Sequence, residues 1–518
     1  MTRLACDAWL LPTDDRWRIS KSFAPAIGVE PDTCLDRPPW EGTRVQPYEA
    51  WAEGKPWIWL GLVGKDFQTA SWYAECGEAF VAQASAALRE QLIPLDRRPV
   101  LAVNVLGTGE GGMAADKGEI HRALLPVLER AAHDHDADVI LVTWGRRAYA
   151  AAQRERRRHL SREYGGEHHK LWDLGEEHEA LIHQARQLAD QARRHNLVVF
   201  VGAGVSAGVG FPVWQQLLDD LAKEAGLVDG DVEQLRRLDL RDQAALLGRR
   251  FAMVNKQLGS MVSKRFSSTR YSLVHGLLAS LGARENVTTN YDQLFEIAVQ
   301  ANQESLAVLP YEAVHPQQRW LLKLHGSIDH GEDIVITRAD YLGVPSRRGA
   351  LFGIVQAMLL TRHMLFIGYS LSDEDFHAVM HDVSSARSES GGNDASGTAL
   401  TLFTDTIFQD LWSPQLNVVP VAPAANDPTK EEVGAAARQL AIFLDLVCFQ
   451  AADLSAFLLD ESYADMLDND DEHALHDALV ELRGRMESSE SGPGWERVAR
   501  LLEEFEDGAS QVSESRPS

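Results

Sequence analysis

Residues 197–212 read LVVFVGAGVSAGVGFP, an apolar run that leads directly into a glycine-rich turn. The run Leu197–Val201 has the length and the unbroken hydrophobicity of a strand that is buried on both faces of a sheet. The glycines permit a tight turn and let backbone amides approach a pyrophosphate, and an apolar helical pattern follows over residues 214–225. A strand, a glycine turn and a helix in this order predict a dinucleotide site, although a purely structural turn has the same pattern.

Three further strand candidates, the runs at residues 286–289, 320–324 and 364–367, also end in polar motifs. The carboxyl ends of strands in a doubly wound parallel sheet face one crevice. We therefore expect the residues after these runs to line one pocket together with the glycine turn. These residues are Asn290-Tyr291-Asp292, His325-Gly326 and Gly368-Tyr369-Ser370.

In their order and approximate spacing, the four motifs resemble the sirtuin family over about residues 195–425. The resemblance implies a Rossmann-like parallel sheet that binds NAD⁺ and cleaves its nicotinamide–ribose bond. His325 would be the catalytic histidine, and Asn290 and Asp292 would lie on the side of the nicotinamide ribose and the nicotinamide. The NAD⁺-binding residues that the resemblance implies are Gly202, Ala203, Gly204, Ser206, Trp214, Gly368 and Ser370.

Several departures from that family bear on the reaction. Its Gln-Asn-Ile-Asp is Thr-Asn-Tyr-Asp at residues 289–292, and its Pro-Asp-Phe-Arg is Pro-Val-Trp-Gln at residues 212–215, where Trp214 can supply the aromatic wall. The four cysteines form no CxxC pair, so the zinc module of protein-deacylating sirtuins is missing. With the run GYSLSD at residues 368–373, the sequence resembles the sirtuin-like domains of bacterial anti-phage defence, including those of Thoeris-type systems. That resemblance implies hydrolysis of NAD⁺ to nicotinamide and ADP-ribose.

The chemistry of this cleavage needs few groups, because neutral nicotinamide leaves an oxocarbenium-like ribosyl centre. An imidazole such as that of His325 can accept a proton from a hydroxyl near neutral pH. Asn290 could hold water and a ribose hydroxyl, whereas Asp292 could favour the cationic nicotinamide, cap the following helix, or do both. For the acidic residues 373–375 we expect capping of a helix rather than chemistry. We expect no metal site.

The first part of the chain shows a second glycine turn. Residues 1–147 alternate strand-like and helical runs, and the run at 100–106 ends in Gly107-Thr108-Gly109-Glu110-Gly111-Gly112. This segment resembles a macro domain, and the resemblance implies that Gly107, Thr108, Gly109, Gly111 and Gly112 bind an ADP-ribose-type nucleotide. A purely structural glycine turn is the alternative.

The predicted class is α/β, with a macro-like domain at residues 1–147, a helical connector at 148–194 and a sirtuin-like NAD⁺-binding domain at 195–450. An acidic helical segment at 451–506 and a disordered tail at 507–518 follow. The 50 basic and 76 acidic residues give a net charge of −26, which disfavours binding to nucleic acid or to an anionic membrane. The basic run at residues 154–158 is expected to be a solvated helical face.

The leading hypothesis is a cytoplasmic NAD⁺ hydrolase that depletes NAD⁺ in anti-phage defence. Family resemblance implies a homo-oligomer whose activation depends on a defence-system partner or a phage trigger. An NAD⁺-dependent deacylase or ADP-ribosyltransferase is the alternative among enzymes. A non-catalytic sensor of NAD⁺ or ADP-ribose is the alternative from another class.

Overall fold

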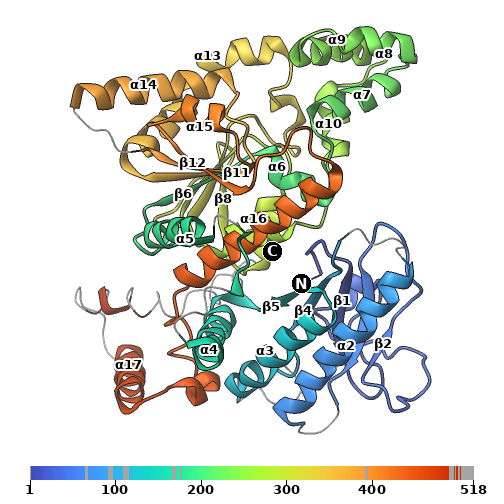
Figure 1. The fold of residues 1–518 in the computed structure, drawn as a ribbon, viewed down its shortest axis with the longest axis vertical. Helices are drawn as coiled ribbons and strands as arrows, with labels where there is room; N and C mark the ends of the chain where they lie inside the picture. Colours follow the sequence, from blue (N-terminus) through green and yellow to red (C-terminus); the bar gives the residue numbers. More distant parts are fainter. Residues whose placement is uncertain are drawn as a thin grey trace. The chain divides into compact units, whose positions relative to one another are not determined.

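The computed structural model of the chain describes residues 2–64, 68–91, 97–108, 116–165, 171–175, 178–390 and 395–488, together with 495, 497–499 and 502. The tail predicted at residues 507–518 lies outside the described residues. The contacts divide the chain into two compact units (Figure 1). The first unit comprises Met1–Leu171, Ala301–Glu304 and Ala452–Ser518, and the second comprises Trp172–Gln300 and Ser305–Ala451.

The first unit contains a five-stranded sheet in the order β2-β3-β1-β4-β5. Its strands are β1 (Ala8–Thr13), β2 (Val45–Pro47), β3 (Trp57–Leu62), β4 (Val100–Asn104) and β5 (Asp138–Val142), and α1 (Ala24–Ile27) lies between β1 and β2. All neighbours are parallel except β2 and β3. The helices α2 (Ala70–Gln91) and α3 (Lys117–Asp134) bury apolar side chains against this sheet. Strands alternating with helices are what the sequence predicted for this region.

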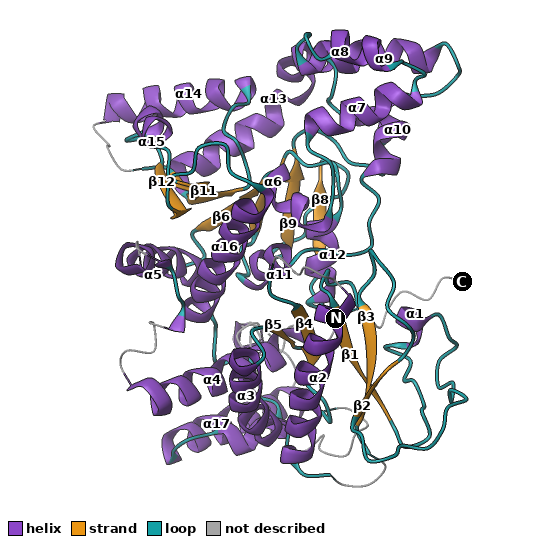
Figure 2. Cartoon of the chain, turned by 45° about the vertical axis from the view of Figure 1, so that its right-hand side comes forward, coloured by secondary structure: helices purple, strands orange, loops and turns teal. Residues whose placement is uncertain are grey.

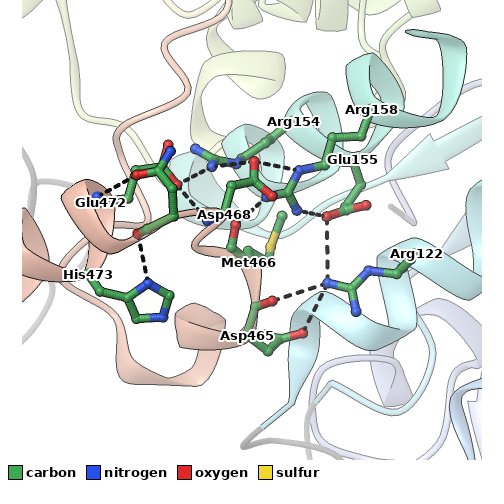
Figure 3. A network of polar contacts seen from close by, with 10 residues as sticks. Arg122, Arg154, Glu155, Arg158, Asp465, Met466, Asp468, Glu472 and His473 are labelled. Atoms are coloured by element: carbon green, nitrogen blue, oxygen red, sulfur yellow. Dashed lines mark hydrogen bonds and ion pairs between the residues drawn. The ribbon is translucent and has the colours of Figure 1, made fainter. Parts of the chain in front are cut away.

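The rest of the first unit joins the helix after β5 to the end of the chain. The helix α4 (Gly145–Tyr164) contacts a C-terminal segment that contains η5 (Glu461–Met466) and α17 (Asp470–Ser488). Arg154 and Arg158 of α4 are not solvated, since their side chains are 12% and 14% exposed and pair with Asp468 and Glu472 (Figure 3). The expectation of a solvated basic face is therefore wrong, because the acidic C-terminal segment covers it.

The second unit is built on seven parallel strands in the order β12-β11-β10-β6-β7-β9-β8. Figures 1 and 2 show helices on both faces of this sheet. The strands are β6 (Leu197–Val201), β7 (Glu285–Thr288), β8 (Leu306–Leu309), β9 (Arg319–Lys323), β10 (His363–Ile367), β11 (Gly397–Phe403) and β12 (Asn417–Ala422). The α/β class and the parallel, Rossmann-like arrangement are confirmed.

The helices of the second unit fall into three groups. One face of the sheet carries α13 (Arg338–Thr361), α14 (Glu374–Ser390) and α15 (Thr406–Trp412), which share an apolar core with β6 and β10. The other face carries α5 (His178–Arg193), α11 (Leu273–Ser280), α12 (Leu294–Ala301) and α16 (Lys430–Ala451) (Figure 2). Between β6 and β7 the chain forms α6 (Ala203–Ser206), η3 (Ala207–Val209), α7 (Trp214–Glu224), α8 (Asp229–Leu235), α9 (Leu240–Ala252) and α10 (Leu258–Arg265).

The third group, α7 to α10, has an apolar cluster of its own that includes Leu218, Leu247, Phe251 and Tyr291. Tyr291 belongs to the polar motif that follows β7, so this helical layer supports the end of the sheet that carries the motifs. Among the described helices, none combines the length and the hydrophobicity needed to cross a membrane.

Candidate active site

Strand register brings the four motifs to one edge of the second sheet. Ile367 pairs with Val201, Val201 with Thr288, and Thr288 with Lys323, so these residues form one row across β10, β6, β7 and β9. The glycine motifs begin directly after Val201 and Ile367, and Asn290 and His325 are each two residues beyond Thr288 and Lys323. The prediction that the motifs share the carboxyl edge of a parallel sheet is therefore confirmed.

The glycine turn after β6 is packed against the turn after β10. The amide of Gly202 donates to Ile367 O, and the amide of Gly204 donates to Gly368 O, both at 2.8 Å. A Cβ on Gly202 would lie 2.4 Å from Gly368 O, and one on Gly368, whose φ is +63°, would lie 2.6 Å from Val205 N. Glycine is thus required for this backbone contact, which brings two of the predicted NAD⁺-binding turns together. Ala203 and Gly204 are exposed, whereas Gly202 is buried.

Buried polar side chains connect this turn to the motif after β7. Ser206 Oγ donates to Asp292 Oδ2 at 2.7 Å, and Asn290 Nδ2 donates to Gly202 O and to Ser206 Oγ, both at 3.1 Å. Asn290 is 8% and Asp292 5% exposed. Asn290 Oδ1 is buried and has no hydrogen-bond partner among the described residues, so it can still accept a hydrogen bond from a ligand. Asp292 Oδ1 accepts from Leu294 N at 3.0 Å, which also confirms its predicted capping role.

A lysine that the sequence analysis did not single out holds the same motif in place. Lys323 Nζ is fully buried, and it donates to Asp292 O at 2.5 Å and to Tyr291 O at 3.3 Å. It also pairs with Glu296 Oε1 at 2.7 Å. Burial raises the pKa of Glu296 despite this ion pair. A lysine directly after the apolar residues 320–322 was the sequence feature that could have indicated this role.

A second buried histidine lies near the cluster. His275 Nδ1 is 2.8 Å from Ser272 Oγ, and burial lowers the pKa of His275 to about 4, although the charge of Asp292 opposes the change. Its Nε2 has no hydrogen-bond partner within the described ranges. The ring is therefore neutral near pH 7, and its partner Ser272 Oγ also lies 3.5 Å from Val205 O of the glycine turn.

His325 follows β9 and is 4% exposed. Its ring lies edge-on to Tyr341, with centroids 5.4 Å apart, and its Nε2 is 3.4 Å from Asp373 Oδ2. Burial is the main cause that lowers the pKa of His325; Arg348 and Arg241 act in the same direction and Asp373 opposes them. A neutral imidazole near pH 7 is the form that can accept a proton.

The acidic residues after β10 do begin a helix, as predicted. The helix α14 starts at Glu374, and Asp373 Oδ1 accepts from Asp375 N at 3.3 Å. The structure adds the contact between Asp373 and His325, which the sequence analysis did not anticipate. Ser370, predicted to bind NAD⁺, is exposed and its Oγ lies 2.6 Å from Ser372 Oγ.

The remaining predicted site residues are Trp214 and the glycine turn of the first unit, and part of that turn lies outside the described residues. Trp214 packs on the apolar cluster of α7 to α10, to which Tyr291 also belongs. In the first unit, Gly107 has φ +82°, and a Cβ there would lie 2.6 Å from the Tyr73 ring, which explains this glycine structurally. Thr108 Oγ1 donates to Val105 O at 3.0 Å. Gly109, Gly111 and Gly112 lie outside the described residues.

Comparison with known proteins agrees with the site in the second unit. Residues 284–408 match the family described as SIR2-like domain. The chain is 25% identical over 210 residues to the NAD(+) hydrolase ThsA of Bacillus cereus (strain MSX-D12), which covers 39% of this chain and 42% of that protein. It is 28% identical over 205 residues to a protein of the same name from Enterococcus faecium, with 38% and 42% covered.

A third relative is the Defense-associated sirtuin 2 of Bacillus subtilis, 26% identical over 223 residues, which cover 40% of this chain and 21% of that protein. The matches thus span less than half the length of each of these relatives. The segment matched by the family contains Asn290, Asp292, His325, Gly368 and Asp373, and so most of the polar edge described above. Residues 284–408 of the second unit are thus similar to SIR2-like domains.

Proposed function

We propose that this chain hydrolyses NAD⁺ to nicotinamide and ADP-ribose at the edge formed by β10, β6, β7 and β9. The observation that carries the proposal is the row of motifs on four neighbouring strands, where a glycine turn, a buried Ser206–Asn290–Asp292 cluster and His325 follow one another. Two relatives of the chain are named NAD(+) hydrolase.

Each part of the edge has a place in that reaction. The exposed residues Ala203 and Gly204 would lie beside the pyrophosphate, with Gly368 and Ser370 on the adenosine side and Trp214 as an aromatic wall. Asn290 Oδ1 would accept a hydrogen bond from a ribose hydroxyl or water. Asp292, already held by Ser206, would favour the cationic nicotinamide. The neutral His325 would accept the proton of the attacking hydroxyl.

The biological setting is part of the same proposal. One relative is named Defense-associated sirtuin 2, which supports a role in anti-phage defence by depletion of NAD⁺. Unrestrained hydrolysis would kill the host cell, so the activity would depend on a trigger from the phage or on a partner, and on assembly into a homo-oligomer in the cytoplasm. The first unit, proposed to be macro-like, would sense an ADP-ribose-type nucleotide through the turn that contains Gly107 and Thr108.

Water and a protein acceptor predict nicotinamide release under different conditions. The four cysteines, Cys6, Cys34, Cys76 and Cys448, form no zinc-binding pair in the sequence, which favours water over an acyl-lysine peptide. A deacylase or an ADP-ribosyltransferase would release nicotinamide only when a protein acceptor is present. A non-catalytic sensor would bind NAD⁺ and release none.

The test follows nicotinamide release from NAD⁺ by the purified full chain, with and without acceptor proteins, ADP-ribose, cyclic ADP-ribose and lysate of phage-infected cells. We expect release without an acceptor, and we expect His325→Ala and Asn290→Ala each to reduce it at least 100-fold. The exposed His315 provides the matched control, because His315→Ala should retain the parent rate. An His325→Ala variant as fast as the parent would contradict the proposed mechanism.

A further inference from the structure

We propose that Asp373 is a positioning residue for His325: its carboxylate orients the imidazole and stabilises the imidazolium that forms when His325 accepts a proton. The step rests on the proposed function, whereas the pairing of the two side chains stands on the geometry alone.

The pairing joins two strands that are not neighbours. Asp373 follows β10, which is separated from β9 by β6 and β7, so residues 368–373 must cross the ends of both strands to reach His325. The Asp373 side chain is 13% exposed, and its Oδ2 lies 3.4 Å from His325 Nε2. This nitrogen is sealed from solvent and makes no aligned hydrogen bond within the described part of the chain. A small closure of the segment, such as ligand binding can produce, would align the two groups.

The surrounding charges show why a carboxylate is needed at this place. The groups that act on His325 are Asp373, Arg348 of α13 and Arg241 of α9, and the ring of Tyr341 covers one side. Both guanidinium groups disfavour an imidazolium, as burial does. Asp373 is the group that favours it. Without this carboxylate, a buried imidazole facing two cations would be a poor proton acceptor.

Asp375 is a second carboxyl group close to Asp373. Burial, and then the charge of Asp373, raise the pKa of Asp375 to about 6, while Arg241 opposes the change. Two neighbouring carboxyl groups avoid being ionised together, and the raised pKa of Asp375 limits the negative charge that builds up beside Asp373.

The proton transfer can be written out for this arrangement. A carboxylate at Nε2 favours the tautomer with the proton on Nε2, which leaves the lone pair of Nδ1 to accept. Water forms a bond to C1′ of the ribose as the C1′–N bond breaks, and that bonding pair neutralises the nicotinamide ring. The proton of the water passes to Nδ1 of His325 and then to solvent. The products are nicotinamide, ADP-ribose and one proton.

A metal site is the competing interpretation of the same residues. Ligand atoms of His325, Asp373 and Asp375 all lie within 4.8 Å of one another, and these residue types bind metal ions. Arg241 and Arg348 face this group of residues, and their positive charges would oppose a cation there. Proton transfer between His325 and its ligand needs no bound cation, so the geometry favours a His325–Asp373 pair over a metal site.

The test compares Asp373→Asn with Glu374→Gln, the adjacent acidic residue, whose side chain is 79% exposed. For Asp373→Asn we expect kcat for nicotinamide release to fall roughly 10- to 100-fold while KM stays within about twofold, since the lost group acts through His325. The acid limb of the pH profile should move to lower pH. Glu374→Gln should keep kcat, KM and the limb of the parent, and Asp373→Glu should recover part of the loss.

A second readout does not depend on turnover. In the full chain labelled with ¹³C-histidine, and with His325 assigned by His325→Gln, Asp373→Asn should lower the pKa of His325, whereas Glu374→Gln should not. An unchanged titration together with an unchanged pH profile would overturn the proposal. Loss of activity on EDTA treatment, restored by Mg²⁺ or Zn²⁺, would overturn it in favour of a metal site. If no variant or parent releases nicotinamide but the titration shifts, the proposed function fails and the pairing stands.

Discussion

Lys323 illustrates how the site depends on a residue that touches backbone rather than ligand. Its ammonium group binds the carbonyl oxygens of Tyr291 and Asp292 and pairs with the buried Glu296. Removing one member of a buried pair leaves the other charge uncompensated, which costs about 3–5 kcal/mol. We therefore expect Lys323→Met to lower the free energy of unfolding of the second unit by about 3 kcal/mol, measured in urea by hydrogen exchange of residues 285–300.

The matched control for Lys323→Met is the double variant Lys323→Met/Glu296→Leu, which removes both charges. It should be more stable than the single variant, because no charge is then left buried. A single variant that loses less than about 1 kcal/mol would show that the lysine does not hold the motif.

His275 provides a prediction on pH. Its pKa is about 4 in the folded chain, below the ordinary value of about 6.5, so the unfolded chain binds a proton first as the pH falls. The stability of the second unit is then fully present above about pH 6.5 and decreases as the pH falls towards 4, by up to about 3 kcal/mol from this residue. Urea unfolding between pH 7 and pH 4.5 should show this slope, and His275→Gln should show a shallower one. Equal slopes for the parent and His275→Gln would contradict the lowered pKa of His275.

At the scale of residues, the sequence predicted the members of the cluster but not all of their contacts. Asn290, Asp292 and Ser206 were proposed separately, and the structure brings them into one hydrogen-bonded group. Lys323 reads in the sequence as the polar end of a strand, and Asp373 reads as a helix cap, which it is. Their further contacts depend on which strands are neighbours and how a segment crosses them. That information is not local in the sequence.

At the scale of elements, periodicity predicted the buried strands well and the short edge strands poorly. The apolar runs at β6 and β10 are continuous because helices cover both faces of the sheet (Figure 2). β8 has only four residues and lies at the edge, and it was not predicted. Its pattern is too short to be distinguished from a loop.

Gly202 keeps the turns after β6 and β10 in contact, which leads to a prediction about these two elements. At Gly202, φ is −105°, so an alanine meets no backbone restriction, but its Cβ would lie 2.4 Å from Gly368 O and 2.5 Å from Tyr369 Cα. We expect Gly202→Ala to separate the two turns, abolish nicotinamide release and lower the free energy of unfolding by roughly 1–3 kcal/mol. Gly208→Ala is the control in the same loop, since its Cβ would meet Ser272 Cβ at an ordinary 3.4 Å. Equal behaviour of both variants would exclude a steric role for Gly202.

At the scale of the whole chain, the C-terminal segment returns to the first unit over more than 300 residues. Asp468 and Glu472 bind Arg154, and Asp465 lies 3.6 Å from Arg122, which also approaches the buried Glu155 (Figure 3). The sequence showed a basic run and an acidic stretch, each of which is compatible with a solvated surface. Only the fold reveals that the two surfaces neutralise each other.

Apolar side chains of the same C-terminal segment also pack on α4. Met466 is fully buried in a cluster with Ala150, Ala151 and Phe457, whereas Leu475 of α17 is 48% exposed. Removing a buried side chain of this size costs about 2–5 kcal/mol, and a change at an exposed position costs about 0.5 kcal/mol or less. We therefore expect Met466→Ala to accelerate hydrogen exchange in α3 and α4, where the segment packs, and Leu475→Ala to leave it unchanged. Because the second unit shares no part of this cluster, exchange in β6 and β7 should be the same in both variants. Faster exchange confined to α17 would mean that the C-terminal segment does not contribute to the stability of the first unit.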